Sequence, residues 1–246
     1  MVIKKAFRKI FYLAILLLIA LIALYLFLHS PYFNIEKIYT TGLKQLTEEE
    51  VLSYSGVTIG QNLFEVDNNL TVRTIEVHPM VKSVELVKHL PRTLEIKVLE
   101  REIWAIVPLG NEFLCIDNEG VVIDRRINIE LIDYPLITIS NLPERVNIGQ
   151  VIQPQGIQLV NQVWKALNNS ARESISDFHL NDKQELIIYT SGGTEIRFGN
   201  EERLEEKANF IHDILKLETE FNKNGTEVLE YIDLRFKGQP VVKTKV

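Results

Sequence analysis

The chain has 246 residues, a formal net charge of −6 and a single cysteine, Cys115. One cysteine excludes an intrachain disulfide, and an acidic balance disfavours a nucleic-acid partner, because phosphate binding needs clustered Lys and Arg. Cys115 lies between Leu114 and Ile116, so we expect a buried, inert thiol.

An apolar stretch near the N-terminus, Ile10–Leu28, contains no charge, Pro or Gly. As a helix it would be about 28 Å long, close to the thickness of a bilayer's hydrocarbon core. Its Leu, Ile and Phe residues favour membrane insertion by about −4 to −8 kcal/mol. A cleaved signal peptide has a shorter apolar core and a small-x-small cleavage site, which is absent after Leu28. A buried core helix would need a domain around it on all sides, which a segment this near the N-terminus does not favour. We therefore expect a retained membrane-spanning helix.

Four basic residues precede this stretch: Lys4, Lys5, Arg8 and Lys9. Between Leu28 and Glu36, the only residue that can carry a positive charge is His29. The positive-inside bias predicts a cytoplasmic tail over residues 1–9 and export of everything after Leu28. The protein is thus expected to be a single-pass membrane protein with a short linker, residues 29–32, and a large extracytoplasmic part.

The next segment, residues 33–101, reads as an α+β unit. We predict a strand over Phe33–Thr41 and a short helix to Ser55 that begins with a Thr47/Glu50 capping box. A second helix is capped by Asp67 and runs to about Val77, with Leu70, Ile75 and Val77 facing inward. The strands Val81–Leu90 and Thr93–Glu102 follow as an antiparallel hairpin. Two helices can then cover one face of the sheet.

Residues 102–246 read as a β-rich domain with two or more helices. Helical periodicity predicts helices over Pro154–Asn168 and over Glu201–Phe221, the second capped by Asn200. The predicted strands and apolar runs are Phe113–Ile116, Val121–Ile123, Tyr134–Ile139, Phe178–Leu180, Glu185–Thr190, Thr194–Phe198, Tyr231–Phe236 and Val241–Val246.

Several short motifs, in this order and spacing, resemble the FtsQ/DivIB family of bacterial cell-division proteins. They are Ile38–Gly42 (IYTTG), Gly60–Asp67 (GQNLFEVD), Pro79–Val81 (PMV), Leu90–Ile96 (LPRTLEI), Leu114–Val122 (LCIDNEGVV) and Tyr231–Arg235 (YIDLR). The resemblance covers almost the whole chain. It implies a POTRA domain over 33–101 followed by the β-rich domain.

The resemblance also implies a function. Such a protein is a non-enzymatic scaffold of the divisome that resides at the septum, binds FtsB- and FtsL-like (DivIC-like) bitopic proteins and helps control septal peptidoglycan synthesis. A terminal strand can leave one edge open to an added strand. The resemblance places the partner-binding residues at Tyr231, Ile232, Asp233, Leu234, Arg235, Phe236, Lys237, Pro240 and Val241. Tyr231, Arg235 and Phe236 are the expected side-chain anchors. The residues alone allow an ordinary terminal strand instead, protected by Lys237, Pro240 and Lys243.

The sequence was compared with two other classes of protein. An anchored exported hydrolase should carry a recognisable motif, but the chain has no His-Glu-x-x-His and no Gly-x-Ser-x-Gly, and its five histidines are scattered. Paired carboxylates of a glycosidase leave no such signature and stay open. A POTRA protein of export or outer-membrane assembly usually has several such domains or a β-barrel. We therefore expect no catalytic residue, metal, cofactor or small-molecule substrate.

Overall fold

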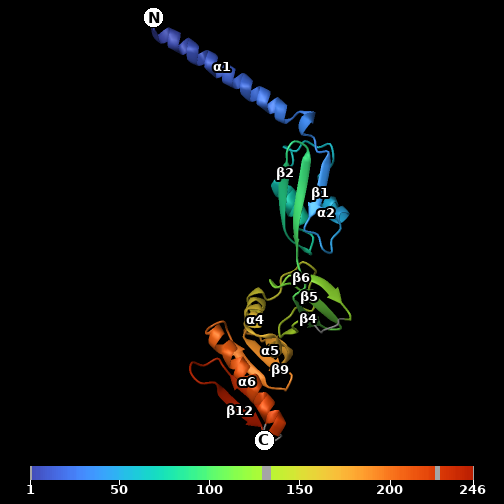
Figure 1. The fold of residues 1–246 in the computed structure, drawn as a ribbon, viewed down its shortest axis with the longest axis vertical. Helices are drawn as coiled ribbons and strands as arrows, with labels where there is room; N and C mark the ends of the chain where they lie inside the picture. The colour runs from blue at the N-terminus through green and yellow to red at the C-terminus, as the bar shows by residue number, and fades with distance from the viewer. Residues whose placement is uncertain (1, 129–133, 225–227, 246) are drawn as a thin grey trace. The chain divides into compact units, whose positions relative to one another are not determined.

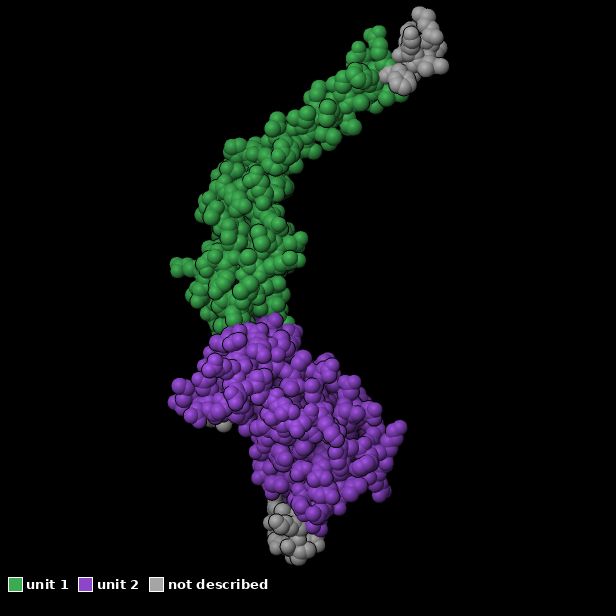
Figure 2. Space-filling view, turned by 180° about the vertical axis from the view of Figure 1, so that it is seen from behind, with its two compact units in different colours: residues 1–100 green, residues 101–246 purple. Residues whose placement is uncertain are grey.

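The computed structural model describes residues 2–128, 134–224 and 228–245. Val246, the last residue of the predicted final strand, lies outside these ranges. The chain divides into two compact units, residues 1–100 and 101–246, which carry separate cores (Figures 1 and 2).

The chain begins with one long helix, α1 (Val2–Leu28). Its segment Arg8–Leu28 is apolar and long enough to cross a membrane, and none of its most hydrophobic window is buried (Figure 1). The predicted span from Ile10 lies within it. One such helix fits a single-pass membrane protein.

The sheet of the first unit contains β1 (Lys37–Thr41), β2 (Val81–His89) and β3 (Thr93–Glu100). The order is β1-β3-β2, with β1 parallel and β2 antiparallel to the central β3. The strict alternation of β3 buries Leu94 and Ile96 completely. The first strand begins later than predicted, because Pro31–Phe33 forms a 3-10 turn, η1, ahead of it.

Two short helices cover this sheet, α2 (Glu48–Ser55) and α3 (Asn68–Ile75), and both predicted caps are confirmed. The Thr47 backbone N–H donates to Glu50 at 2.8 Å, while the Thr47 hydroxyl accepts from the Glu50 N–H at 3.3 Å. The predicted inward face is wrong in two of three positions: Leu70 is 60% exposed and Val77 is 71% exposed. Because α3 ends at Ile75, Val77 is outside the helix.

The second unit is built on a six-stranded sheet in the order β12-β11-β10-β9-β8-β7. These strands are β7 (Ile137–Ile139), β8 (Ile175–Leu180), β9 (Leu186–Thr190), β10 (Glu195–Gly199), β11 (Val228–Asp233) and β12 (Val241–Lys245). A second, three-stranded sheet contains β4 (Ala105–Leu109), which the sequence analysis did not predict, with β5 (Glu112–Ile116) and β6 (Val122–Arg126). Cys115 is buried in it, and burial raises the pKa of its thiol.

Three helices pack against the six-stranded sheet: α4 (Pro154–Ala166), α5 (Asn169–Glu173) and α6 (Leu204–Asn224). The core between them contains Val160, Val163, Phe178 and Ile211, each at most 1% exposed. The helix α6 begins three residues later than predicted. Asn200 is therefore not its cap, and its side chain instead accepts the N–H of Glu202 at 3.1 Å. The predicted α+β class, with an apolar N-terminal helix and a β-rich C-terminal domain, is confirmed.

Candidate partner-binding site

The predicted partner-binding strand is interior to its sheet. Along β11, Tyr231 is registered with Glu195 of β10 on one side and with Lys243 of β12 on the other. The expectation of an open backbone edge is therefore wrong for Tyr231, Ile232 and Asp233, which are paired on both sides. The chain leaves β11 after Asp233, reverses in a loop that contains Gly238 at φ 107°, and returns as β12, which covers the edge that β11 would otherwise expose.

This sheet has β12 at one edge and β7 at the other, where Leu136 forms an isolated bridge with Ile106 of β4. In the part of the chain that the structure describes, β12 pairs with β11 alone, so its other side presents unpaired N–H and C=O groups. Val241 is 49% exposed and Val242 is 51% exposed. The strand begins with two valines and continues with Lys243, Thr244 and Lys245, and its unpaired backbone can accept an additional strand although lysines often protect such an edge.

Register decides which face each β12 side chain occupies. Val242 is opposite the buried Ile232, so it lies on the face that the helices cover. Lys243 is opposite Tyr231 and therefore lies on the outer face. An incoming strand would meet an apolar side chain on the inner face and a polar, aromatic surface on the outer one.

The outer face beside the edge is built around the Tyr231 ring. The Arg197 guanidinium lies 3.9 Å from the ring centroid, and the Lys243 ammonium lies 5.6 Å from it on the edge side. Arg197 also donates to Glu195 at 2.7 Å, and this hydrogen bond raises the pKa of the guanidinium. Lys243 donates to Glu230 at 2.9 Å. Tyr231 thus sits between two cations, within reach of a partner strand on β12.

Three predicted binding residues have side chains that a partner cannot reach. Ile232, Asp233 and Leu234 are each at most 5% exposed. The apolar residues Ile232 and Leu234 alternate with polar ones because they belong to the core of the second unit.

Arg235 is also engaged within the chain. Its guanidinium binds both carboxylate oxygens of Asp233, at 2.7 to 3.2 Å, and these hydrogen bonds hold the pKa of Asp233 below its usual value. Its stem packs over Gly199, where an added Cβ would come within 2.8 Å of the Arg235 Cγ. Arg235 therefore holds the start of the β11–β12 loop in place.

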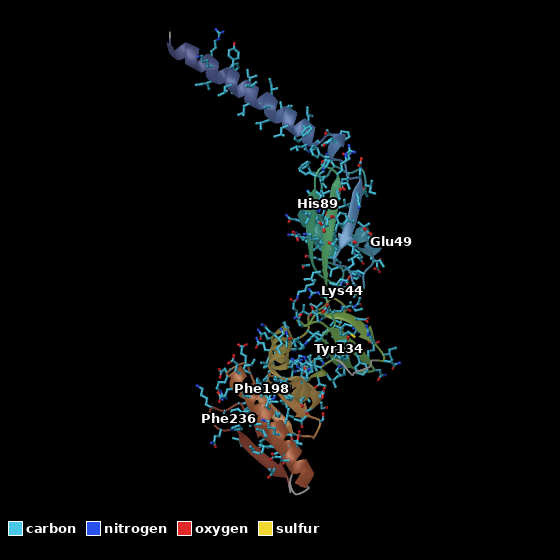
Figure 3. The ribbon with its side chains drawn as sticks, in the orientation of Figure 1. Lys44, Glu49, His89, Tyr134, Phe198 and Phe236 are labelled. Atoms are coloured by element: carbon cyan, nitrogen blue, oxygen red, sulfur yellow. The ribbon has the colours of Figure 1, made fainter. Side chains whose placement is uncertain are left out.

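The remaining predicted residues lie in the loop or on the edge. Phe236 is 61% exposed, and its backbone oxygen accepts from Arg203 at 2.7 Å (Figure 3). Lys237 and Val241 are exposed, and Pro240 is half-buried. The predicted partner-binding residues did not include Val242 and Thr244 of the edge strand, and Lys243 was expected only to protect an ordinary terminal strand.

Two matches to family models cover most of the chain. The model "POTRA domain, FtsQ-type" matches residues 33–101, and the model "Cell division protein FtsQ/DivIB, C-terminal" matches residues 105–235. The chain belongs to the FtsQ/DivIB family. Its C-terminal match ends two residues after β11, so the free edge strand β12 lies beyond the part of the chain that the family model describes.

Curated proteins of this family match most of the chain. Cell division protein DivIB of Clostridium botulinum strain Loch Maree is 29% identical over 244 residues, which cover 97% of this chain and 91% of that protein. Cell division protein FtsQ of Anaeromyxobacter sp. strain K is 30% identical over 189 residues, covering 76% and 63%. These relatives are named as cell division proteins and not as enzymes. A solved structure, POTRA1-2 of Omp85 from Anabaena, matches at 10% identity with a TM-score of 0.26, too low for any argument.

Proposed function

We propose that this FtsQ/DivIB protein is a non-enzymatic, single-pass scaffold of the divisome. It binds FtsB- and FtsL-like (DivIC-like) bitopic proteins by strand addition to β12, and through them it helps control septal peptidoglycan synthesis. The observation that carries the proposal is the edge strand β12, whose backbone is paired on one side only within the described residues.

Main-chain hydrogen bonds supply affinity in this mode of recognition, while alternate side chains supply specificity. Val242, half-exposed on the inner face, offers an apolar contact next to the core residue Ile232. Tyr231 on the outer face and the exposed Phe236 in the β11–β12 loop supply aromatic surface of the kind that is enriched at interface hot spots. Tyr231 and Phe236 are the proposed side-chain anchors, whereas Arg235 is bound to Asp233, and the added strand pairs with β12 rather than with β11.

A pair of proline variants tests the mechanism. Consecutive residues of an edge strand direct their N–H groups to opposite sides. One of the two variants, Val242→Pro or Lys243→Pro, therefore removes an N–H that points outward, and the other removes an N–H that points to β11. The variant with the native thermal transition is the one whose β11 pairing is intact. We expect that variant to lose about tenfold or more in affinity for the purified bitopic partner, measured by pull-down or titration in detergent.

Matched threonine variants separate backbone from side-chain effects. Val242→Thr and Lys243→Thr keep the N–H groups and the strand propensity, so each should bind the partner within a few-fold of the wild type. Partner binding at wild-type affinity by the natively folded proline variant would refute strand addition. The loss of binding by Phe236→Ala or Tyr231→Ala would then identify a side-chain interface instead.

A further inference from the structure

The residues directly after α1 are hydrogen-bonded to a loop of the α+β domain that follows them. Phe33 is only 6% exposed, and its carbonyl accepts the N–H of Leu63 at 2.9 Å. Two residues later, Ile35 exchanges backbone hydrogen bonds with the same loop, donating to Gln61 and accepting from Gly60. The helix therefore reaches the folded domain within a few residues.

The end of α1 is itself attached to this loop. The side-chain amide of Asn62, a residue only 6% exposed, donates to the carbonyl oxygen of Leu28 at 3.0 Å and to that of Ser30 at 3.3 Å. The Phe27 ring packs edge-on against Phe33 with centroids 5.2 Å apart. These contacts satisfy carbonyls that a helix end leaves unpaired, and they hold the loop 57–64 at the point where α1 ends.

Large apolar side chains are exposed on the segments that meet here. Ile59 is 70% exposed, Leu90 61%, Tyr32 52% and Phe64 39%. We call these four residues the membrane-proximal rim.

The β2–β3 turn that carries Leu90 belongs to the same end of the domain. Arg92 donates from its side chain to the Tyr32 carbonyl at 2.9 Å, and its own carbonyl accepts the N–H of Glu36 at 2.9 Å. His89, the last residue of β2, lies toward α1, while Lys44 lies at the opposite end of the domain (Figure 3).

We propose that the membrane-proximal rim rests in the headgroup–acyl boundary of the bilayer that α1 spans. Residues that are hydrogen-bonded to the last turn of a membrane span lie at the membrane interface, where Tyr and exposed apolar side chains are favoured. The guanidinium of Arg92 is paired with Glu36, and Glu65 nearby is exposed, so the contact is apolar rather than a match to anionic lipid. The POTRA domain then lies against the membrane surface. This inference depends on the membrane span in the proposed function.

Depth-dependent quenching in vesicles tests the contact. Full-length variants with one added cysteine, Ile59→Cys and Leu90→Cys, carry an environment-sensitive dye at the added residue, and Val77→Cys is the matched control. Val77 is 71% exposed on the same domain. It lies before the first residue of β2, whereas Leu90 follows the last one, so the two residues are at opposite ends of this strand. The native Cys115 is completely buried and stays unlabelled in the folded protein, which the wild type controls. The vesicles contain phosphatidylcholine and phosphatidylglycerol, with a nitroxide either just below the headgroup or near the acyl end.

The shallow quencher should remove about half of the dye emission at residues 59 and 90 and leave the dye at residue 77 unchanged. A dye at Leu18→Cys, in the middle of α1, should respond to the deep quencher and reports the span separately. Quenching at residue 18 with equal, unquenched emission at 59, 90 and 77 would overturn the rim proposal while leaving the anchor intact. No quenching at residue 18 would instead remove the membrane span on which both depend.

Discussion

Lys207, on α6, has almost no access to water. The residue is 1% exposed, and its ammonium donates to the carbonyls of Phe198 at 2.9 Å and Asn200 at 2.7 Å while it lies 4.3 Å from the centroid of the Phe198 ring. It thereby ties α6 to the end of β10, the strand next to β11. Burial, together with the smaller effect of the nearby Arg203, lowers the pKa of Lys207 to about 8, against the opposing charges of Glu202 and Glu206.

This lysine should give stability a distinctive pH dependence. The unfolded side chain keeps its proton up to its ordinary pKa of 10.5, whereas the folded one releases it near pH 8, so unfolding takes up a proton between these values. Raising the pH from 8 to 10.5 should therefore stabilise the wild type relative to Lys207→Met, by up to about 3 kcal/mol. Denaturant unfolding at a series of pH values measures this difference.

The control is Lys216→Met, because the Lys216 side chain is 76% exposed and only pairs with Asp213 at 3.8 Å. Its difference from the wild type should stay constant across the same window. An equally constant difference for Lys207→Met would mean that Lys207 titrates as an exposed lysine does.

At the scale of elements, the helices of the first unit owe their starts to single side chains. Asp67 precedes α3, and its Oδ1 accepts the N–H of Asn69 at 3.0 Å and of Leu70 at 3.1 Å. These are two of the donors that the start of a helix leaves unpaired. The carbonyl of Val66, the residue before this cap, accepts a hydrogen bond from Lys88 of β2. This bond attaches the segment between the loop 57–64 and α3 to the sheet.

Asp67→Ala should lower the stability of α3 by about 1 kcal/mol, because both N–H groups lose their acceptor. Native-state hydrogen exchange should detect this as about a fivefold faster exchange of the later α3 amides. Asp67→Asn keeps an acceptor oxygen and should exchange at nearly the wild-type rate. Identical exchange in the Ala and Asn variants would contradict a capping role.

The apolar stretch Ile10–Leu28 of α1 lies between the basic residues at the start of that helix and the residues that form the two cores. The charge bias across α1 predicts that the tail stays in the cytoplasm. A phosphatase that folds only outside the cytoplasm, fused after Val246, should therefore be active.

Replacing Lys4, Lys5, Arg8 and Lys9 by Asn should reduce that activity at equal expression, because the positive-inside bias is lost. A reporter that works only when it is cytoplasmic is the complementary control. Activity of that cytoplasmic reporter in the wild-type fusion would reject the proposed orientation.

Features that depend on neighbours along the chain were predictable from the sequence. The span is recognised by the absence of charges over Ile10–Leu28, and the capping box by the three-residue spacing of Thr47 and Glu50. The β2–β3 hairpin follows from two alternating runs joined by a short turn. In each case the interacting groups are only a few residues apart, so composition and spacing contain the information.

The open edge of the sheet was decided by tertiary structure alone. Residues 231–236 and 241–246 both read as terminal strands, and either could have been the outermost. The pairing of Tyr231 with Glu195, 36 positions earlier, and with Lys243 places β11 inside and β12 at the edge. Which strand remains unpaired depends on how distant segments compete for the same backbone hydrogen bonds, and no local pattern in one sequence records the outcome of that competition.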